Sequence, residues 1–282
     1  MKTKLLVLMT LLLGVAYGCS DDDDKDFEFV SEVTKEAFMQ DFPEATGVEW
    51  EKKQDYYVVE FYVDKREMEA WYDNTGKLYI TEKDLSKEEL PDAVLKAFES
   101  SPYADWKIDD IDQYERKGYE TIYILEVERG KEEVDLVYNE DGILLREIVD
   151  NPGSHNPGDY IIAELPNEIK AYLDENHKEA RIVDVDLEHT KWEVEIIEKG
   201  IKKELDFSVD GKNWLQTKWE IKESDLPHEV IMGIKNTEYA DWEIDDVDYI
   251  EKPEGVFYWV EFEKKGMDDV KKLFKSDGSL VE

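Results

Sequence analysis

The chain has 282 residues, of which 72 are acidic and 35 basic, so its formal net charge is −37. A surface this negative repels nucleic-acid phosphates, which argues against a DNA or RNA partner. Apolar residues make up 41% and aromatic residues 12% of the chain, which indicates a folded body of one or two domains rather than a disordered acidic chain.

The N-terminus has the pattern of a targeting segment. Lys2 and Lys4 precede an apolar run, LLVLMTLLLGVAYG, that is shorter than the roughly 20 residues of a membrane-spanning helix. The run ends in AYGC, which resembles a bacterial lipobox, although Tyr17 is bulkier than the usual residue there. This predicts a signal peptide over residues 1–18 and lipidation of Cys19. The alternative is a soluble secreted protein whose cysteine has no special role. Because Cys19 is the only cysteine, lipidation would leave no thiol for a disulfide or a nucleophile.

An acidic run, SDDDDKD, follows this cysteine directly. Such a run is solvated by default, so residues 19–26 are predicted to form a lipidated acidic tether. Next to a lipidated cysteine, the run resembles the acidic export signal of surface-exposed lipoproteins in some outer-membrane bacteria. We therefore expect an outer-membrane lipoprotein on the cell surface, and the periplasmic face of that membrane is the alternative.

The rest of the chain consists of four copies of one unit. Residues 85–146 (unit 2) align without a gap with residues 221–282 (unit 4), at a constant offset of 136 residues. The phrase YADWKIDDID in the first becomes YADWEIDDVD in the second. Two weaker copies are unit 1, over about residues 27–78, and unit 3, over residues 165–211.

Two Asn-Pro-Gly triplets mark a linker between units 2 and 3. They lie in residues 150–158, where proline and glycine prevent a helix or strand from continuing. This predicts one domain over residues 27–149 and another over residues 159–282. Because a unit of ~60 residues buries only about 60% of its unfolded surface, we expect the two units of each domain to share one core.

Each unit is predicted to be a helix followed by strands. In unit 2, Pro91 suits a first helical turn, and Val94 and Phe98 recur at helical spacing. Four strand-like runs follow, and Asp141-Gly142 between the last two is a hairpin signal. The predicted fold class is α+β: two tandem domains, each with two repeats of a helix followed by about four antiparallel strands, and with the helices packed on a sheet.

The repeated tryptophan phrase opens the first strand of units 2 and 4. Trp106 and Ile108 would face the helix, and the double aspartate after them would form a β-bulge that returns Ile111 to the same face. Trp242 would play the same part in unit 4, and Trp50 in unit 1. We therefore interpret the phrase as a core anchor combined with a device that twists the strand.

The aspartates of this phrase allow a second interpretation, a structural calcium site. Hard oxygen ligands suit Ca²⁺, and the candidate ligands are Asp109, Asp110, Asp112, Asp245, Asp246 and Asp248. However, no stretch fits the loop of an EF-hand, and a chain with 72 carboxylates has acidic clusters by chance. We expect no metal and no cofactor.

Several of these features together resemble a known family. The segment DFPEATGVEWEK, the Leu-Pro helix openings, the segment EVDLVYNEDGILL and the paired units are similar to PepSY-like domains, which are also described as resembling beta-lactamase inhibitor protein in fold. The resemblance covers roughly residues 27–149 and 159–282 and implies an α+β fold with helices on an antiparallel sheet. It also implies a role in inhibiting or modulating peptidases. Unit 3 departs most, because HKEARIVDVD replaces the tryptophan phrase.

No enzyme motif is present. The chain lacks G-x-S-x-G, G-x-G-x-x-G, a Walker loop and H-E-x-x-H. Its four histidines, which share no ligand spacing, are His155, His177, His189 and His228. Acidic pairs are so abundant that no chosen pair indicates glycosidase chemistry. We expect a protein without catalytic activity.

The expected function is binding. We expect a non-enzymatic, lipid-anchored envelope or surface protein that binds a protein or peptide, with a basic partner favoured by the acidic charge and a peptidase as one possible target. The first alternative is a glycan-binding lipoprotein, whose stacking residues would come from Trp71, Trp192, Trp214, Trp219 and Trp259. The second is a structural envelope spacer.

Overall fold

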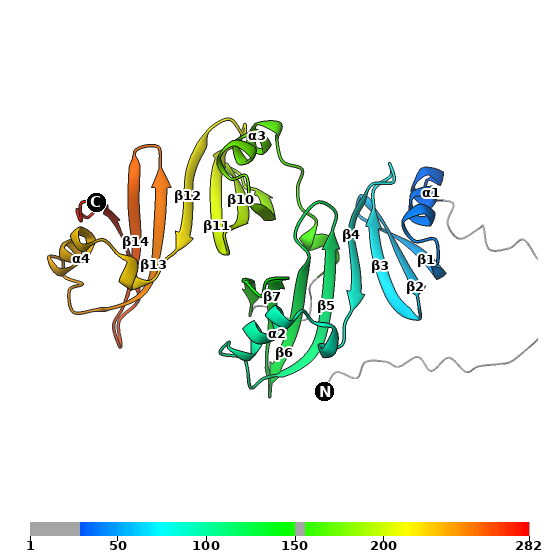
Figure 1. Cartoon of the computed structure of the whole chain (residues 1–282), viewed down its shortest axis with the longest axis horizontal. Helices are drawn as coiled ribbons and strands as arrows, with labels where there is room; N and C mark the ends of the chain where they lie inside the picture. The colour runs from blue at the N-terminus through cyan, green and yellow to red at the C-terminus, as the bar shows by residue number, and fades with distance from the viewer. Residues whose placement is uncertain (1–28, 150–155, 282) are drawn as a thin grey trace, which may run out of the picture.

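The computed structural model describes residues 29–149 and 156–281, which form two antiparallel sheets, each with helices on one face (Figure 1). The predicted signal peptide, the tether with Cys19 and most of the predicted linker lie outside the described residues. Among the described residues, no helix is both long enough and apolar enough to cross a membrane.

The first sheet contains eight strands in chain order, each paired with its neighbours in sequence. They are β1 Thr46–Lys53, β2 Tyr56–Val63, β3 Arg66–Tyr72, β4 Leu78–Asp84, β5 Lys107–Arg116, β6 Ile122–Arg129, β7 Glu132–Asn139 and β8 Leu144–Ile148. The helices of this half are α1 Glu32–Asp41, the 3₁₀ turn η1 Lys87–Glu89 and α2 Asp92–Glu99.

The second sheet contains seven strands, also in chain order. They are β9 Arg181–Leu187, β10 Lys191–Glu198, β11 Ile201–Ser208, β12 Trp214–Glu220, β13 Glu243–Lys252, β14 Gly255–Glu263 and β15 Val270–Lys275. The helices here are η2 Pro157–Tyr160, α3 Asn167–Asn176, η3 Glu223–Asp225 and α4 His228–Lys235.

The predicted α+β fold with two tandem repeated domains is confirmed. Units 1, 2 and 3 each consist of one α-helix and four strands, and unit 4 has α4 and three strands. In unit 4, Leu280 forms an isolated bridge with Phe274 at the position of a fourth strand. The last strand of one unit pairs with the first strand of the next, β4 with β5 and β12 with β13, so each pair of units forms one continuous sheet.

The expectation of one shared core for each pair of units is met only on one face of the first sheet, where residues of units 1 and 2, among them Val58 and Ile124, form one cluster opposite the helices. Every unit has its own cluster beneath its helix: Phe38 anchors the cluster of unit 1 and Phe98 that of unit 2. Leu173 and Val230 belong to the corresponding clusters of units 3 and 4. The hydrogen-bonded sheet, rather than a common core on the helix side, therefore joins the two units of a pair.

The predicted bulge in the tryptophan phrase is present in both strong repeats. Ile108 pairs with Val127 while Asp110 pairs with Glu126, so Asp109 is the extra residue. Strand β13 has the same irregularity between Ile244 and Asp246. Beyond the bulges, Ile111 and Val247 are buried beneath the helices, as expected.

The two indoles of the phrase lie at the margins of these cores. Trp106 and Trp242 are half-buried and pack against the clusters below α2 and α4. Each meets a tyrosine ring edge-on, and a cation lies over each indole, with the Arg129 guanidinium carbon 4.6 Å and the Lys264 ammonium 5.6 Å from the ring centroids. They are core anchors, but each keeps one exposed side.

The two sheets meet at a junction on the face of the first sheet that lies opposite its helices. We call this side of each sheet the open face. Tyr160 of η2, Val183 of β9 and Ile197 of β10 join one hydrophobic cluster with residues of β2 to β8. Arg116 donates from Nη1 to the Val183 carbonyl at 2.8 Å, and the Arg146 guanidinium lies 2.6 Å from an oxygen of Asp184.

Candidate functional site

The open face of the first sheet carries most of the notable side chains. Side chains alternate between the two faces of a strand. In β2, Val59 and Phe61 belong to the cluster beneath α1, so Glu60 between them points to the open face. Beyond the junction with the second sheet, this face is lined by carboxylates.

Four glutamates form a row across adjacent strands. Glu49 of β1 pairs with Glu60 of β2, Glu60 with Glu69 of β3, and Glu69 with Glu82 of β4. Paired residues of an antiparallel sheet have Cβ atoms only about 4.5–5.5 Å apart, and like charges in this position are destabilising. The fold therefore keeps a ladder of mutually repelling carboxylates in place.

A second group of carboxylates continues this surface across the middle strands. Asp84 pairs with Asp112, Asp110 pairs with Glu126, and Glu126 pairs with Asp135. Two of them are buried, Asp112 with 5% and Asp135 with 1% of the residue's surface exposed.

The titration behaviour of two members reflects this crowding. Partial burial, together with the charges of Glu69 and Glu51, raises the pKa of Glu60. Partial burial, together with the charges of Asp112 and Asp110, raises the pKa of Asp84. Both groups therefore lose their protons at a higher pH than free carboxyls do, as expected where negative charges lie close together.

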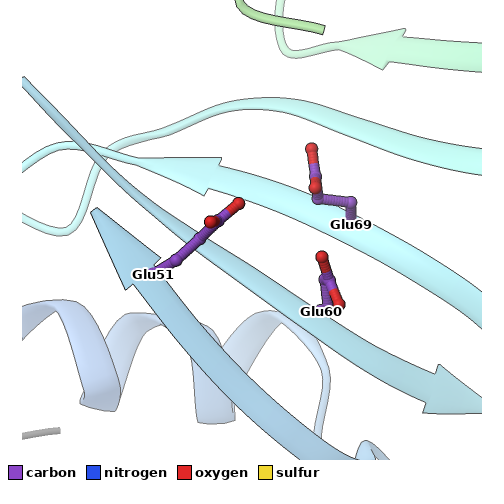
Figure 2. Close-up of side chains that lie close together, drawn as sticks. All are labelled: Glu51, Glu60 and Glu69. Atoms are coloured by element: carbon purple, nitrogen blue, oxygen red, sulfur yellow. The ribbon is translucent and has the colours of Figure 1, made fainter. Parts of the chain in front are cut away.

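One lysine lies among the carboxylates at the edge of this face. Figure 2 shows Glu51, Glu60 and Glu69. One carboxylate oxygen of each residue lies within 4.8 Å of those of the other two. The Lys53 ammonium is 2.6 Å from Glu51 and 3.3 Å from Glu69. Burial alone would lower the pKa of Lys53, but these two carboxylates raise it. This surface can thus hold an ammonium group between its strands.

A groove of about 340 Å³ follows the row over β2, β3 and β4. Its lining residues are Glu60, Glu67, Met68, Glu69, Glu82, Lys83 and Asp84. The groove is shallow and charged rather than apolar, which suits the side chains of a basic segment better than an apolar small molecule.

The six calcium candidates are divided by the structure. Asp110 and Asp112 lie close to Glu126 in one of four carboxylate groups with suitable spacing among the described residues. Asp109 instead pairs with Lys107 at 2.6 Å. In unit 4, Asp246 and Asp248 lie 4.0 and 3.3 Å from the Lys271 ammonium, and Asp245 is the extra residue of the bulge. Calcium binding at these residues stays a prediction.

The other candidates from the sequence are dispersed. His177 lies 3.3 Å from Glu198, whereas His189 and His228 are exposed, and His155 lies outside the described residues. No described histidine belongs to a group that could hold a metal.

Most of the tryptophans that could stack on a glycan are buried or lie against other aromatic rings of the protein. Trp71 and Trp192 are buried, Trp214 stacks on Tyr172, and Trp219 lies against Tyr249. Of the glycan-stacking candidates, Trp259 alone stands among the exposed large hydrophobic residues of the described chain, with 37% exposure. The structure thus offers no continuous aromatic platform among the described residues.

Sequence reasoning missed the glutamate row. Part of the signal was available, because VVEFYV and REMEAWY each place a glutamate on the face opposite the apolar residues that lie under the helix, whereas simple alternation in LYITEKD puts Glu82 on the same face as Ile80. The abundance of acidic residues concealed it, since only the register between strands shows which of 72 carboxylates are neighbours.

Comparisons with known proteins found one matching family model and several similar solved structures. A family model described as beta-lactamase-inhibitor-like, PepSY-like matches residues 26–146, 160–212 and 196–282. A solved BLIP-like protein from Bacteroides fragilis is 36% identical, covers 48% of this chain and 99% of its own, and has a TM-score of 0.43. A solved DUF2874 family protein from Bacteroides ovatus is 26% identical, covers 47% and 97%, and has a TM-score of 0.44. Among curated proteins, none matches this chain.

Proposed function

The chain belongs to the beta-lactamase-inhibitor-like, PepSY-like family, and from this premise we propose that it is a non-enzymatic envelope protein that binds a basic segment of another protein on the open face of its first sheet. The family description refers to an inhibitor-like fold, which supports binding rather than catalysis. Membership of this family also makes a peptidase one candidate for the protein that is bound.

The row of paired glutamates carries this proposal. Each pair of like charges directly opposite each other costs on the order of 0.2–1 kcal/mol, and three such pairs follow one another over Glu49, Glu60, Glu69 and Glu82. A cationic partner would relieve this repulsion, so part of the cost becomes binding energy. Stability lost at a site in this way is typical of surfaces that serve function.

The geometry favours lysine and arginine side chains as the bound groups. The row spans four strands, and adjacent strands lie about 4.8 Å apart, so several cations from one extended segment could lie above it. Lys53 between Glu51 and Glu69 shows within the chain how an ammonium fits this surface. The negative charge of the whole molecule would also speed the encounter with a basic partner and make it salt-dependent.

The test is a comparison of two triple variants with the same change of charge. In the first, Glu60, Glu69 and Glu82 of the row are replaced by glutamine. In the second, glutamine replaces three exposed glutamates on the helices, Glu36, Glu99 and Glu175. We expect lysine-rich peptides to bind the first variant at least tenfold more weakly than the wild type, and the second with nearly unchanged affinity.

Two further results would accompany specific binding. The affinity of the wild type should fall steeply between low and physiological salt. The row variant should also be at least as stable as the wild type, because the repulsion that is removed, about 0.2–1 kcal/mol for each pair, exceeds the contribution of the partly exposed ion pair between Lys53 and Glu69 that is lost with it. Equal loss of affinity in both triple variants would mean that peptides respond to the net charge alone, which would contradict the proposal.

The proposed location is the outer membrane, through lipidated Cys19, with the body on the cell surface or on the periplasmic face. The motif at the cysteine and the acidic tether support this proposal. Replacing Cys19 by serine should move the protein from the membrane fraction to the soluble fraction. Protease treatment of intact cells then distinguishes the two faces, since a surface protein is digested and a periplasmic one is protected.

A further inference from the structure

An ammonium group is held at the edge of the open face of the first sheet. It belongs to Lys53, the last residue of the edge strand β1. Its Nζ lies 2.6 Å from a carboxylate oxygen of Glu51 and 3.3 Å from one of Glu69. It also lies over the ring of Trp71, 5.2 Å from the centroid. Two carboxylates and an aromatic face thus surround one cation, and both kinds of group attract an ammonium.

Trp71 builds one wall of this site. The residue is buried, with 3% of its surface exposed, and its Nε1 donates to Oε1 of Glu69. This bond leaves Oε2 of Glu69 as the oxygen that faces the Lys53 ammonium. An ammonium needs only one oxygen of a carboxylate, whereas a guanidinium binds best through both. The site is therefore better suited to lysine than to arginine.

The resident ammonium is free to leave the site. The side chain of Lys53 is 32% exposed and stands at the edge of the sheet, where it can turn toward solvent. Ion pairs that remain in contact with water contribute little to stability. Moving this ammonium out of the site would therefore cost the fold little.

The site adjoins the groove that the proposed partner would enter. Glu69 contacts Lys53 and also lines the groove, as does Glu60, its partner in the row. One carboxylate oxygen each of Glu51, Glu60 and Glu69 lies within 4.8 Å of the others. The single positive charge of Lys53 offsets only part of their negative charge, so a cation in the groove is attracted to the same place.

On the premise of the proposed function, we propose that the site formed by Glu51, Glu69 and Trp71 binds the ammonium of a lysine side chain from the basic partner. In the free protein Lys53 fills this site as an internal ligand. In the complex the partner's lysine takes its place, and the Lys53 side chain turns out into solvent.

The first test removes the internal ligand. Lys53→Met leaves the site open, so a lysine-rich peptide should bind roughly two- to fivefold more tightly, the gain expected when a partly exposed ion pair no longer has to be broken. The matched control is Lys264→Met in unit 4. The Lys264 ammonium also lies near a carboxylate and an indole, 2.7 Å from Asp241 and 5.6 Å from the ring centroid of Trp242. This control removes the same charge and should leave the affinity nearly unchanged, and an equal gain in both variants would overturn the proposal.

A pair of peptides tests the preference for lysine. The two peptides have the same length, with lysines in one and arginines at the same positions in the other, and each is titrated against the wild type and Lys53→Met. Because the two proteins differ only at this site, the gain in affinity on replacing Lys53 should be larger for the lysine peptide. An equal or larger gain for the arginine peptide would contradict the assignment of the site to lysine.

The third test follows the Lys53 amine in the wild type, without any substitution. Amines are labelled with a limiting amount of acetic anhydride, and the labelling of Lys53 relative to that of Lys264 is measured by mass spectrometry. Displacement frees the Lys53 amine, so its relative labelling should rise when a saturating lysine-rich peptide is added. Unchanged or lower labelling would mean that Lys53 keeps its place, which would overturn the proposal.

These results separate the lysine site from the proposed function on which it rests. If the row variant loses binding while Lys53→Met gains no more affinity than its control, the lysine site is wrong and the proposed function stands. If lysine-rich peptides bind neither the wild type nor Lys53→Met, both are wrong.

Discussion

A glycine in the last turn of every unit lies against the beginning of that unit's helix. Gly142 in unit 2 has φ +77°, and a Cβ atom there would collide with the carbonyl of Ala93 in α2. Gly278 in unit 4 has φ +83° and is blocked in the same way by the carbonyl of Glu229 in α4. The Asp-Gly pairs predicted the hairpins, but the glycines have a second role, since they let the turn approach the helix.

Replacing Gly142 by alanine should therefore cost more than a turn glycine usually does. The left-handed backbone alone costs about 1–2 kcal/mol with a Cβ, and displacing the helix adds about 1–3 kcal/mol of overpacking. We expect urea unfolding to show a loss of roughly 2–5 kcal/mol. The matched control is Gly130→Ala, at φ +72° with nothing within 4 Å, which should lose only the backbone part. Equal losses of unfolding free energy in the two variants would show that the contact between the turn and the helix does not contribute to stability.

The raised pKa of the Asp84 carboxyl leads us to expect a particular dependence of the protein's stability on pH. Because its pKa is raised in the folded protein, the folded state binds this proton more tightly than the unfolded state does. Its contribution favours folding at low pH and is lost as the pH rises through the folded pKa. Asp84→Asn removes the charge, so the variant should be more stable than the wild type at pH 7.

This advantage of Asp84→Asn should shrink as the pH falls toward 4, the ordinary range of aspartate. The measurement is the difference in urea midpoint between variant and wild type across pH 4 to 8. Using the difference cancels carboxylates with lowered pKa, such as Asp73, whose contributions have the opposite sign. An advantage that grows toward acid pH would show that Asp84 is stabilised as an anion.

At the scale of elements, one bulge recurs in the first strand of units 2, 3 and 4. Asp110, Asp184 and Asp246 follow the extra residue, and each carboxylate accepts a hydrogen bond from the next backbone N–H at 2.8–2.9 Å. The extra residue itself differs. It is Asp109 or Asp245 in the strong repeats, but Val183 in unit 3. The same β-bulge thus carries an acidic side chain in units 2 and 4 and an apolar side chain in unit 3, where it lies at the junction.

Deleting the extra residue should be far worse than changing its side chain. Deletion of Asp245 removes the bulge, and a one-residue slip moves every following side chain to the other face. Val247 would then leave its buried position beneath α4, and unit 4 should lose more than about 3 kcal/mol of stability. Asp245→Ala keeps the backbone and should stay within about 0.5 kcal/mol of the wild type. A large loss in Asp245→Ala would instead favour the calcium interpretation.

The sequence predicted these elements because the information is local or repeated. A constant offset located the strong units, Asp-Gly pairs located turns, and a double aspartate located the bulges. It could not predict the glutamate row, which depends on which residues of different strands lie opposite one another. Nor could it predict the junction, because Val183 looks like an ordinary strand valine until β9 is seen to pack on the first sheet.

At the scale of the whole molecule, the junction determines whether the two sheets unfold together. Val183 is buried in the cluster that contains residues of both sheets. Polar contacts surround it: Lys202 donates to the Leu145 carbonyl at 2.7 Å, and Arg181 bridges to Glu120 at 3.2 Å. Buried apolar contact reinforced by hydrogen bonds at its edge is what makes neighbouring domains behave as one cooperative unit.

We therefore expect the wild type to unfold in a single transition, with hydrogen exchange in β2 and in β14 reporting the same free energy. Val183→Asp places a carboxylate in the shared cluster, where its desolvation opposes docking, while β9 keeps its pairing with β10. The transition should then divide into two, and the sheets should report different free energies. The matched control, Val209→Asp, changes a residue that is 50% exposed and should leave one transition. A single transition in Val183→Asp would mean that the sheets are coupled by something other than this junction, and two transitions in the wild type would mean that they are not coupled at all.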